Sequence, residues 1–219
     1  MDGVPVGNGP FEGMSWDHAP LRWELEETSS TLTVWPREES DNWCRTHYGW
    51  GVHDSAHFLS RPFPDDKRAV QVEVVVQAFP LHNYDQAGLM IRRGPGSWIK
   101  CAAEYDPRDG SSRLGAVVTN HGYSDWSTQK ISLEVGTPIT YRVTKYQEHD
   151  VMIQARIGEG HWQQLRISRL FPLTSEGDHD LADLSLFRVG LYCCSPAKEG
   201  FRAVFSNFSV SFLDGPPSD

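Results

Sequence analysis

Short runs of alternating apolar and polar residues dominate this chain. In the clearest run, residues 68–79, Gln71 and Glu73 alternate with valines, which is typical of a half-buried β-strand. Similar runs recur along the chain at residues 21–26, 31–35, 87–93, 97–105, 113–119, 140–146, 151–157, 162–167, 186–192 and 203–212. We expect each of these runs to form a strand.

Glycine and proline separate these runs at short intervals. The segments Gly94–Gly96 and Gly158–Gly160 each lie between two runs and predict two β-hairpins. No stretch of twelve residues has a clear helical period, and the best candidate for a short helix is residues 176–184. Many short strands with almost no helix predict an all-β fold, an antiparallel sandwich or barrel.

Length and composition fit one unit of this kind. A chain of 219 residues can bury a large core without a disulfide or metal to hold it together. All-β sandwiches of this size usually form one domain, so we expect a single domain over residues 1–219. The Gly/Pro/Asp-rich ends are expected to be loose, which leaves an ordered core of about residues 14–213.

The net charge, the apolar runs and the cysteine content argue against several classes of protein. The formal net charge of −9 argues against a nucleic-acid partner, which would need a basic surface. No apolar run reaches the length of a membrane span, and the first residues do not resemble a secretory signal. Four cysteines without CxxC spacing predict free, mostly buried thiols in a cytoplasmic protein.

Two neighbouring runs place unusual side chains on one sheet face. In residues 97–105, Trp98, Lys100 and Glu104 share a face, opposite an apolar face that we expect to be the core. In residues 87–93 and the residue before them, Gln86 and Arg92 likewise share a face. If the two strands pair through the Gly94–Gly96 turn, these five side chains form one polar and aromatic patch.

The same region carries a resemblance to a known family. The segments YDQAGLMIR, WIKCAAEY and VVTNHGYSDWS, with W-x-R-T-x-Y-G from Trp43 and RVGLYCCSP from Arg188, resemble the DUF1349 family of regulation-of-enolase-like proteins. The resemblance covers about residues 21–212. It implies a concanavalin A-like lectin/glucanase fold, a two-sheet jelly roll with one concave sheet. It implies no activity and carries over no catalytic residue.

The patch suggests binding of a carbohydrate or small polar metabolite on the concave sheet, without catalysis. Trp98 would stack on a sugar ring, Gln86 and Glu104 would bind hydroxyl groups, and Lys100 and Arg92 would neutralise acidic groups. The full set of expected ligand-binding residues is Gln86, Arg92, Trp98, Lys100, Glu104, Asn120, Trp126, Tyr48 and Arg188. A plain solvated sheet surface would also explain these residues singly, but an exposed Trp in its middle favours a site.

Two other functions stay open. The patch could be the interface of a regulatory protein-interaction domain, since Trp, Tyr and Arg are typical anchors of interfaces. A glycoside hydrolase using Glu104 would need a second carboxylate, for which Asp106, Asp85 and Asp125 are candidates. The E-x-D-x-x-E pattern of sandwich glucanases is missing, and Pro107 should end the strand at Asp106.

Metal binding has little support in the sequence. His53 and His57 lie four residues apart in a region of loop or strand, where they are too separated for a tight zinc site. Asp178, Asp180 and Asp183 form an acidic segment, but only the fold analogy suggests calcium there. We therefore expect no metal site and no cofactor.

Overall fold

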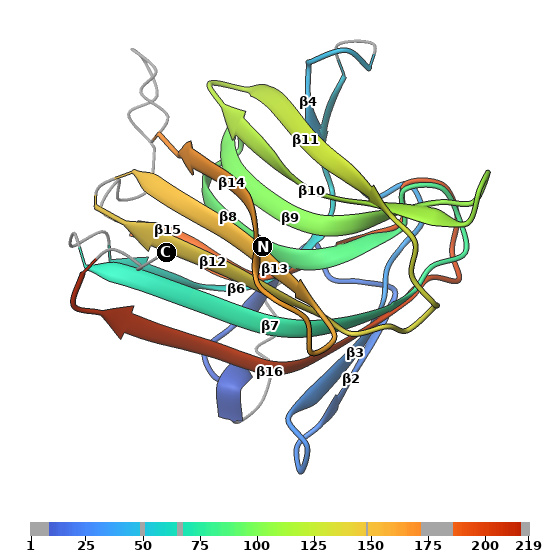
Figure 1. Cartoon of the computed structure of the whole chain (residues 1–219), viewed down its shortest axis with the longest axis horizontal. Coiled ribbons are helices and arrows are strands. Elements are labelled where there is room, and N and C mark those ends of the chain that lie inside the picture. Colours follow the sequence, from blue (N-terminus) through green and yellow to red (C-terminus); the bar gives the residue numbers. More distant parts are fainter. Residues whose placement is uncertain (1–8, 49–50, 65–67, 148, 172–185, 216–219) are drawn as a thin grey trace.

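Two antiparallel sheets make up the computed structural model, which describes residues 9–48, 51–64, 68–147, 149–171 and 186–215 (Figure 1). Each sheet has seven strands. Sheet A consists, in spatial order, of β1 (Ser15–Asp17), β6 (His57–Pro64), β15 (Leu186–Cys194), β8 (Gln86–Gly94), β9 (Ser97–Asp106), β10 (Ser111–Asn120) and β11 (Tyr123–Ile131). Sheet B consists of β14 (Gln163–Arg169), β13 (Asp150–Ile157), β12 (Ile139–Tyr146), β7 (Ala69–Phe79), β16 (Arg202–Leu213), β3 (Thr31–Trp35) and β2 (Arg22–Glu26). A short hairpin of β4 (Asn42–Cys44) and β5 (Val52–Asp54) and a 3-10 turn η1 (Gly9–Phe11) complete the elements.

The predicted antiparallel sandwich is confirmed, and every expected run is a strand. Both hairpins are also confirmed, because β8 pairs with β9 and β13 pairs with β14. Five strands were missed: β1, β4, β5, β6 and β11. Strand β11 alternates poorly because it lies at the edge of sheet A with most of its side chains at least partly exposed. The candidate helix at residues 176–184 lies outside the described residues.

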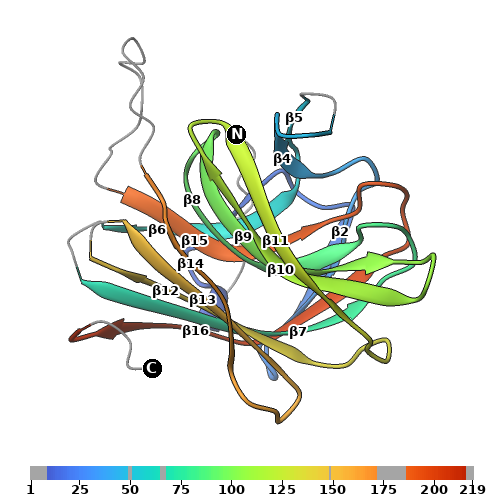
Figure 2. The same ribbon diagram turned by 45° about the horizontal axis from the view of Figure 1, so that its top comes forward.

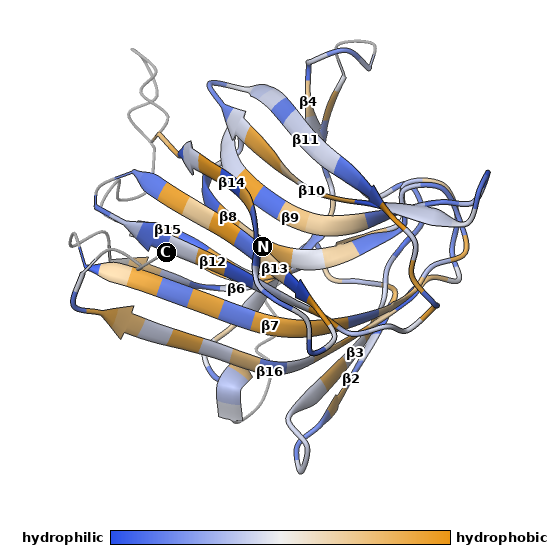
Figure 3. Ribbon diagram, viewed as in Figure 1, coloured by the Kyte–Doolittle hydropathy of each residue, from blue (hydrophilic) through white to orange (hydrophobic). Residues whose placement is uncertain are grey.

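The main core lies between the two sheets. Strand β7 shows why, since its alternating apolar and polar residues appear as bands in Figure 3 and its valines at positions 70, 72, 74 and 76 are buried. From sheet A, the side chains of Leu89, Ile91, Ile99 and Cys101 join the same cluster. The apolar faces expected for residues 87–93 and 97–105 are therefore the core faces. All four cysteines are free and buried, as expected.

The opposite face of sheet A, turned away from sheet B, is partly covered. The β4–β5 hairpin lies beside β11 (Figures 1 and 2) and contributes Trp43 and Cys44 to a second apolar cluster with Met90 and Trp98. Trp98 is 0% exposed, and its indole nitrogen donates to the Pro95 carbonyl oxygen at 3.2 Å. The expectation of an exposed stacking platform at Trp98 is therefore wrong, although its face of the strand is the expected one.

Glycines lie at three central positions on this outer face of sheet A: Gly88, Gly115 and Gly190. A Cβ at Gly88 would lie 1.8 Å from the Cys101 carbonyl oxygen, and the neighbouring backbone is as close at the other two. Glycine permits such close backbone approach, which is typical of bent strands. These positions therefore allow β8, β10 and β15 to curve with the sheet. No helix in the described residues has the length and apolar character that crossing a membrane requires.

Adding a methyl group at Gly190 tests this packing constraint. In Gly190→Ala, the new Cβ would lie 1.9 Å from the Leu59 carbonyl oxygen and 2.7 Å from the Ser60 Cα. Backbone must shift to relieve the overlap, so we expect a loss of about 2–3 kcal/mol in the free energy of unfolding. Thermal melting measures it, with Gly215→Ala as the control because nothing lies within 4 Å of that position. Equal melting temperatures for the two variants would contradict the constraint.

Candidate functional site

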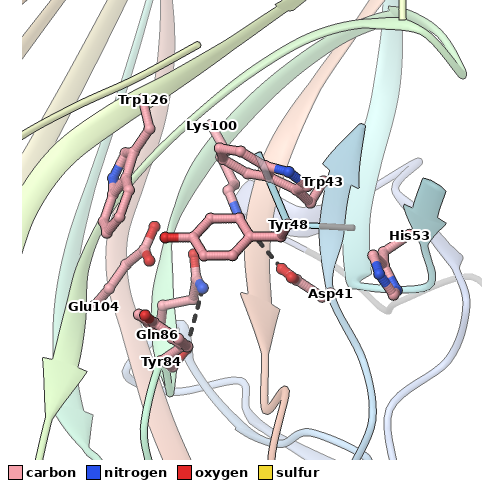
Figure 4. Close-up of a pocket in the computed structure, with 9 residues that line it drawn as sticks. All are labelled: Asp41, Trp43, Tyr48, His53, Tyr84, Gln86, Lys100, Glu104 and Trp126. Atoms are coloured by element: carbon pink, nitrogen blue, oxygen red, sulfur yellow. Dashed lines mark hydrogen bonds and ion pairs between the residues drawn. The ribbon is translucent and has the colours of Figure 1, made fainter. Parts of the chain in front are cut away.

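A pocket opens on the outer face of sheet A, beside the β4–β5 hairpin (Figure 4). Its volume is about 110 Å³, room for about four water molecules at their liquid volume. Nine residues line it: Asp41, Trp43, Tyr48, His53, Tyr84, Gln86, Lys100, Glu104 and Trp126. The size suits one small polar group or a single ring.

Four aromatic rings line the pocket, those of Trp43, Tyr48, Tyr84 and Trp126. The Trp43 ring packs edge-on against Tyr48 with centroids 5.3 Å apart, and Tyr84 packs edge-on against Trp126 at 6.5 Å. The indole nitrogen of Trp43 donates to the Thr46 carbonyl oxygen at 2.7 Å, which holds that ring in place. In Figure 4 the Tyr48 hydroxyl points to the side on which Glu104 and Trp126 lie.

A buried hydrogen-bond network around Lys100 also lines the pocket. The Lys100 ammonium group lies 3.4 Å from Asp41 Oδ1 and donates to the Tyr192 hydroxyl oxygen at 3.0 Å. Tyr192 in turn donates to Gln86 Oε1 at 3.1 Å, and the Gln86 amide donates to the Tyr84 carbonyl oxygen at 3.0 Å. Burial opposes the charge on Lys100, but the carboxylates of Asp41 and Glu104 outweigh it and raise the pKa of the ammonium group.

Glu104 is the charged side chain of the pocket that forms no hydrogen bond or ion pair with a described residue; its opposite charge nearby is Lys100. The residue is only 8% exposed, yet its carboxylate has no such contact. Burial raises its pKa to about 7; Lys100 opposes this rise and Asp41 adds to it. A buried carboxyl group that faces a pocket and titrates near neutrality is typical of a functional site.

The segment around β4 and β5 is fixed to sheet A by polar contacts. The Cys44 amide donates to Ser124 Oγ at 2.9 Å, and the Arg45 guanidinium donates to the Gly122 carbonyl oxygen at 3.2 Å. Asn42 Oδ1 accepts from the Ala56 amide at 3.1 Å. These contacts hold Asp41, Trp43 and Tyr48 over the sheet.

Three of the nine described non-glycine residues with a left-handed backbone lie at or next to the pocket segments. Arg45, His47 and Tyr84 have left-handed φ values of 53°, 65° and 65°. Residues with a side chain rarely adopt this region, and strained backbone is often found at binding sites.

Five of the predicted ligand-binding residues meet in this pocket: Tyr48, Gln86, Lys100, Glu104 and Trp126. The sequence reading missed four others: Asp41, Trp43, His53 and Tyr84. Trp43 and Tyr48 belong to the W-x-R-T-x-Y-G segment, which was the signal that could have found Trp43. Asp41 precedes β4 and His53 lies in β5, and nothing in the sequence pattern indicated that either would lie over sheet A.

The other predicted binding residues do not line the pocket. Arg92 makes a two-pronged ion pair with Asp54 at 2.5 and 2.6 Å, and Arg188 pairs with Asp17 at 2.6 Å. The Asn120 side chain donates to the Arg169 carbonyl oxygen at 2.9 Å and accepts from the Phe171 amide at 3.0 Å. Their polar groups, like the buried Trp98 ring, are engaged within the fold.

None of the three carboxylates considered as catalytic partners of Glu104 lines the pocket. Asp106 ends β9, and hydrogen bonds from Arg108 lower its pKa to about 2. Asp85 accepts from the amides of the chain just before it and from Ser195, and Asp125 pairs with Arg166 at 2.7 Å. The pocket instead contains Asp41, which shares Lys100 with Glu104.

The histidines considered for metal binding have separate environments. His57 is buried, accepts from the Arg37 amide at 2.9 Å and lies 2.7 Å from the His18 carbonyl oxygen. Burial lowers the pKa of His57 to about 4, so it is neutral at physiological pH. Within the described ranges, no three His, Cys, Asp or Glu side chains are grouped so that they could hold a metal ion. The acidic segment of Asp178, Asp180 and Asp183 is outside those ranges.

Glu104→Gln should make the protein more stable at neutral and alkaline pH. The pKa of Glu104 is about 7 when folded and 4.5 when exposed, so the folded state holds the proton more tightly. Stability of the parent protein therefore falls as pH rises from 4.5 through 7, by up to about 3 kcal/mol. The amide that replaces the carboxyl group cannot ionise, and urea unfolding at pH 5 to 8 should show the variant increasingly more stable.

Asp106→Asn is the matched control with the opposite sign. The folded-state pKa of Asp106 is lowered, so its ionised form stabilises the protein above pH 3.8 and the amide variant should lose stability at pH 8. A Glu104→Gln variant that is less stable than the parent protein at pH 8 would contradict an unpartnered carboxylate at this position.

Comparisons with known proteins identify the family. The family model described as "Protein of unknown function (DUF1349)" matches residues 16–212. Regulation of enolase protein 1 from Saccharomyces cerevisiae is 32% identical over 186 residues, which cover 84% of this chain and 83% of that protein.

Solved structures agree with the fold. A functionally unknown protein from Saccharomyces cerevisiae has a TM-score of 0.77 at 28% identity, covering 93% of this chain and 98% of that one. A xylan beta-1,4-xylosidase from Bacillus halodurans has a TM-score of 0.62 at 16% identity, covering 96% of this chain and 41% of the enzyme. The latter likeness is one of fold alone. The family match over nearly the whole chain, together with the yeast relative, means that this protein belongs to the DUF1349 family.

Proposed function

We propose that this protein binds a carbohydrate, as a single sugar unit, or a similarly small polar ligand in the pocket over sheet A, without catalysis. The observation that carries the proposal is Glu104, a buried carboxylate with no partner among the described residues, which faces a hollow walled by aromatic rings. Sugar-sized ligands bind where a few polar groups converge among aromatic walls. Trp126 and Trp43 take the stacking role first expected of Trp98.

The proposed role of each lining side chain follows from its chemical group. An aromatic ring packs against the apolar face of a sugar ring, and Trp126 is half-buried at the pocket while Trp43 is held by its hydrogen bond to Thr46. Glu104 and Asp41 accept hydrogen bonds from hydroxyl groups, for which charged acceptors are the stronger partners. Lys100 is already paired with Asp41 at 3.4 Å.

Tyr48→Ala should weaken ligand binding at least tenfold. The Tyr48 ring lines the pocket and is 49% exposed, so its loss removes a wall at a modest cost in stability. A thermal-shift screen of hexoses, pentoses and sugar phosphates finds the ligand, since a ligand at 100 times its Kd adds about 2.7 kcal/mol. At this chain length each kcal/mol raises the melting temperature by about 2–4 °C.

Tyr123→Ala is the matched control for that variant. Tyr123 is 52% exposed and packs against Arg45, but it does not line the pocket. Equal loss of sugar binding in both variants, or none in either, would rule out the pocket as the site.

A regulatory contact with an enolase is the second candidate. The name of the yeast relative and the exposed side chains near the pocket, Tyr48, Val52 and Tyr123, favour it. Sedimentation of the chain mixed with purified enolase tests it directly. A protein interface should use both tyrosines, so Tyr48→Ala and Tyr123→Ala should each weaken the complex. Two separate species in the parent mixture would contradict this candidate.

A further inference from the structure

The pocket holds more negative than positive charge. Asp41 and Glu104 supply two carboxylates, and Lys100 supplies the one ammonium group among the nine lining residues. Lys100 pairs with Asp41 at 3.4 Å, so those two charges offset each other. The neighbouring Arg92 and Asp54 also neutralise each other. Lys100 also attracts the carboxylate of Glu104, but among the lining residues Glu104 is the charged group that forms no ion pair with a described residue, so one negative charge is in excess.

Aromatic rings surround this surplus charge. Trp43, Tyr48, Tyr84 and Trp126 all line the same hollow (Figure 4). The faces of aromatic rings attract organic cations, and rings grouped around a small pocket are a known means of holding ammonium groups. An anion would instead face two carboxylates, and the net charge of −9 on the whole chain also favours a cation.

We propose that the ligand is an amino sugar whose free ammonium group pairs with Glu104 while its ring packs among the aromatic side chains. This inference rests on the proposed function and names the substrate class of the same pocket. Glu104 is the residue that determines the specificity, because it supplies the one charge in the pocket that has no partner among the described residues.

Polar groups elsewhere in the pocket favour a sugar over a lysine side chain of a partner protein. All the hydrogen bonds and the ion pair of the Asp41 carboxylate with described residues use Oδ1, so its Oδ2 remains for a ligand. The His53 ring and the Tyr48 and Tyr84 side chains also line the hollow. A sugar has hydroxyl groups for Asp41 Oδ2 and the His53 ring, whereas the alkyl chain of lysine would leave these groups without a partner, at a cost in affinity.

Isothermal titration at pH 7 with matched sugars tests the proposal. The probes are D-glucosamine, D-galactosamine and D-mannosamine, each compared with its N-acetyl form and with the parent hexose. We expect at least one amino sugar to bind ten or more times more tightly than both of its neutral counterparts. This comparison uses the unaltered protein, so it does not depend on the folding of any variant.

Glu104→Gln then tests the assigned residue. The variant should lose at least tenfold in affinity for the amino sugar and should no longer bind it more tightly than the neutral hexose. Glu159→Gln, an exposed position in the β13–β14 turn, should bind all probes like the parent protein. Unchanged amino-sugar binding in a folded Glu104→Gln variant would overturn the role of Glu104.

The outcomes separate this inference from the proposed function. Neutral hexoses binding as tightly as amino sugars would overturn the ammonium inference and leave sugar binding in place. Lysine amide binding as tightly as the amino sugars would overturn the assignment to a sugar and would favour a protein partner. Heat from none of the sugars would overturn both proposals.

Discussion

The packing of the β4–β5 hairpin against the outer face of sheet A is the constraint on which the site depends. The hairpin buries Trp98, Met90 and Tyr192 in a second apolar cluster and carries Trp43 and its neighbours over the sheet. Without this cover, Lys100 would lie in water, where an ion pair with Asp41 contributes little. Packing of the hairpin therefore buries the sheet face, forms the polar contacts to β11 and creates the pocket together.

The burial of Glu104 lowers the stability of the free protein and favours the binding of a ligand that pairs with its carboxylate. Burial of Glu104 disfavours its ionised form more than Lys100 favours it, which raises its pKa to about 7, so the charged carboxylate destabilises the free protein. A ligand group that pairs with Glu104 would stabilise its ionised carboxylate on binding. Conflicts of this kind are common at sites selected for function, and they are uncommon in surfaces that serve packing alone.

The sequence predicts the sheets well and the site in part. Alternation along residues 87–93 and 97–105 assigned Gln86, Lys100 and Glu104 to one face, because side-chain direction along a strand has a strict period of two. The alternation of residues along a strand does not predict which other segments cover that face. Asp41 and His53 come from segments distant in sequence, and the same cover buries Trp98, so exposure at these positions depended on tertiary packing.

The protonation of Glu104 is the most direct measure of this account. Carbon-13 NMR of the glutamate side-chain carboxyl groups can follow its titration in the free protein and with a saturating amino sugar. The account predicts a pKa near 7 in the free protein that falls when the ammonium group binds. A Glu104 that titrates near 4.5 in both states would contradict it, since its carboxylate would then already be stabilised without a ligand.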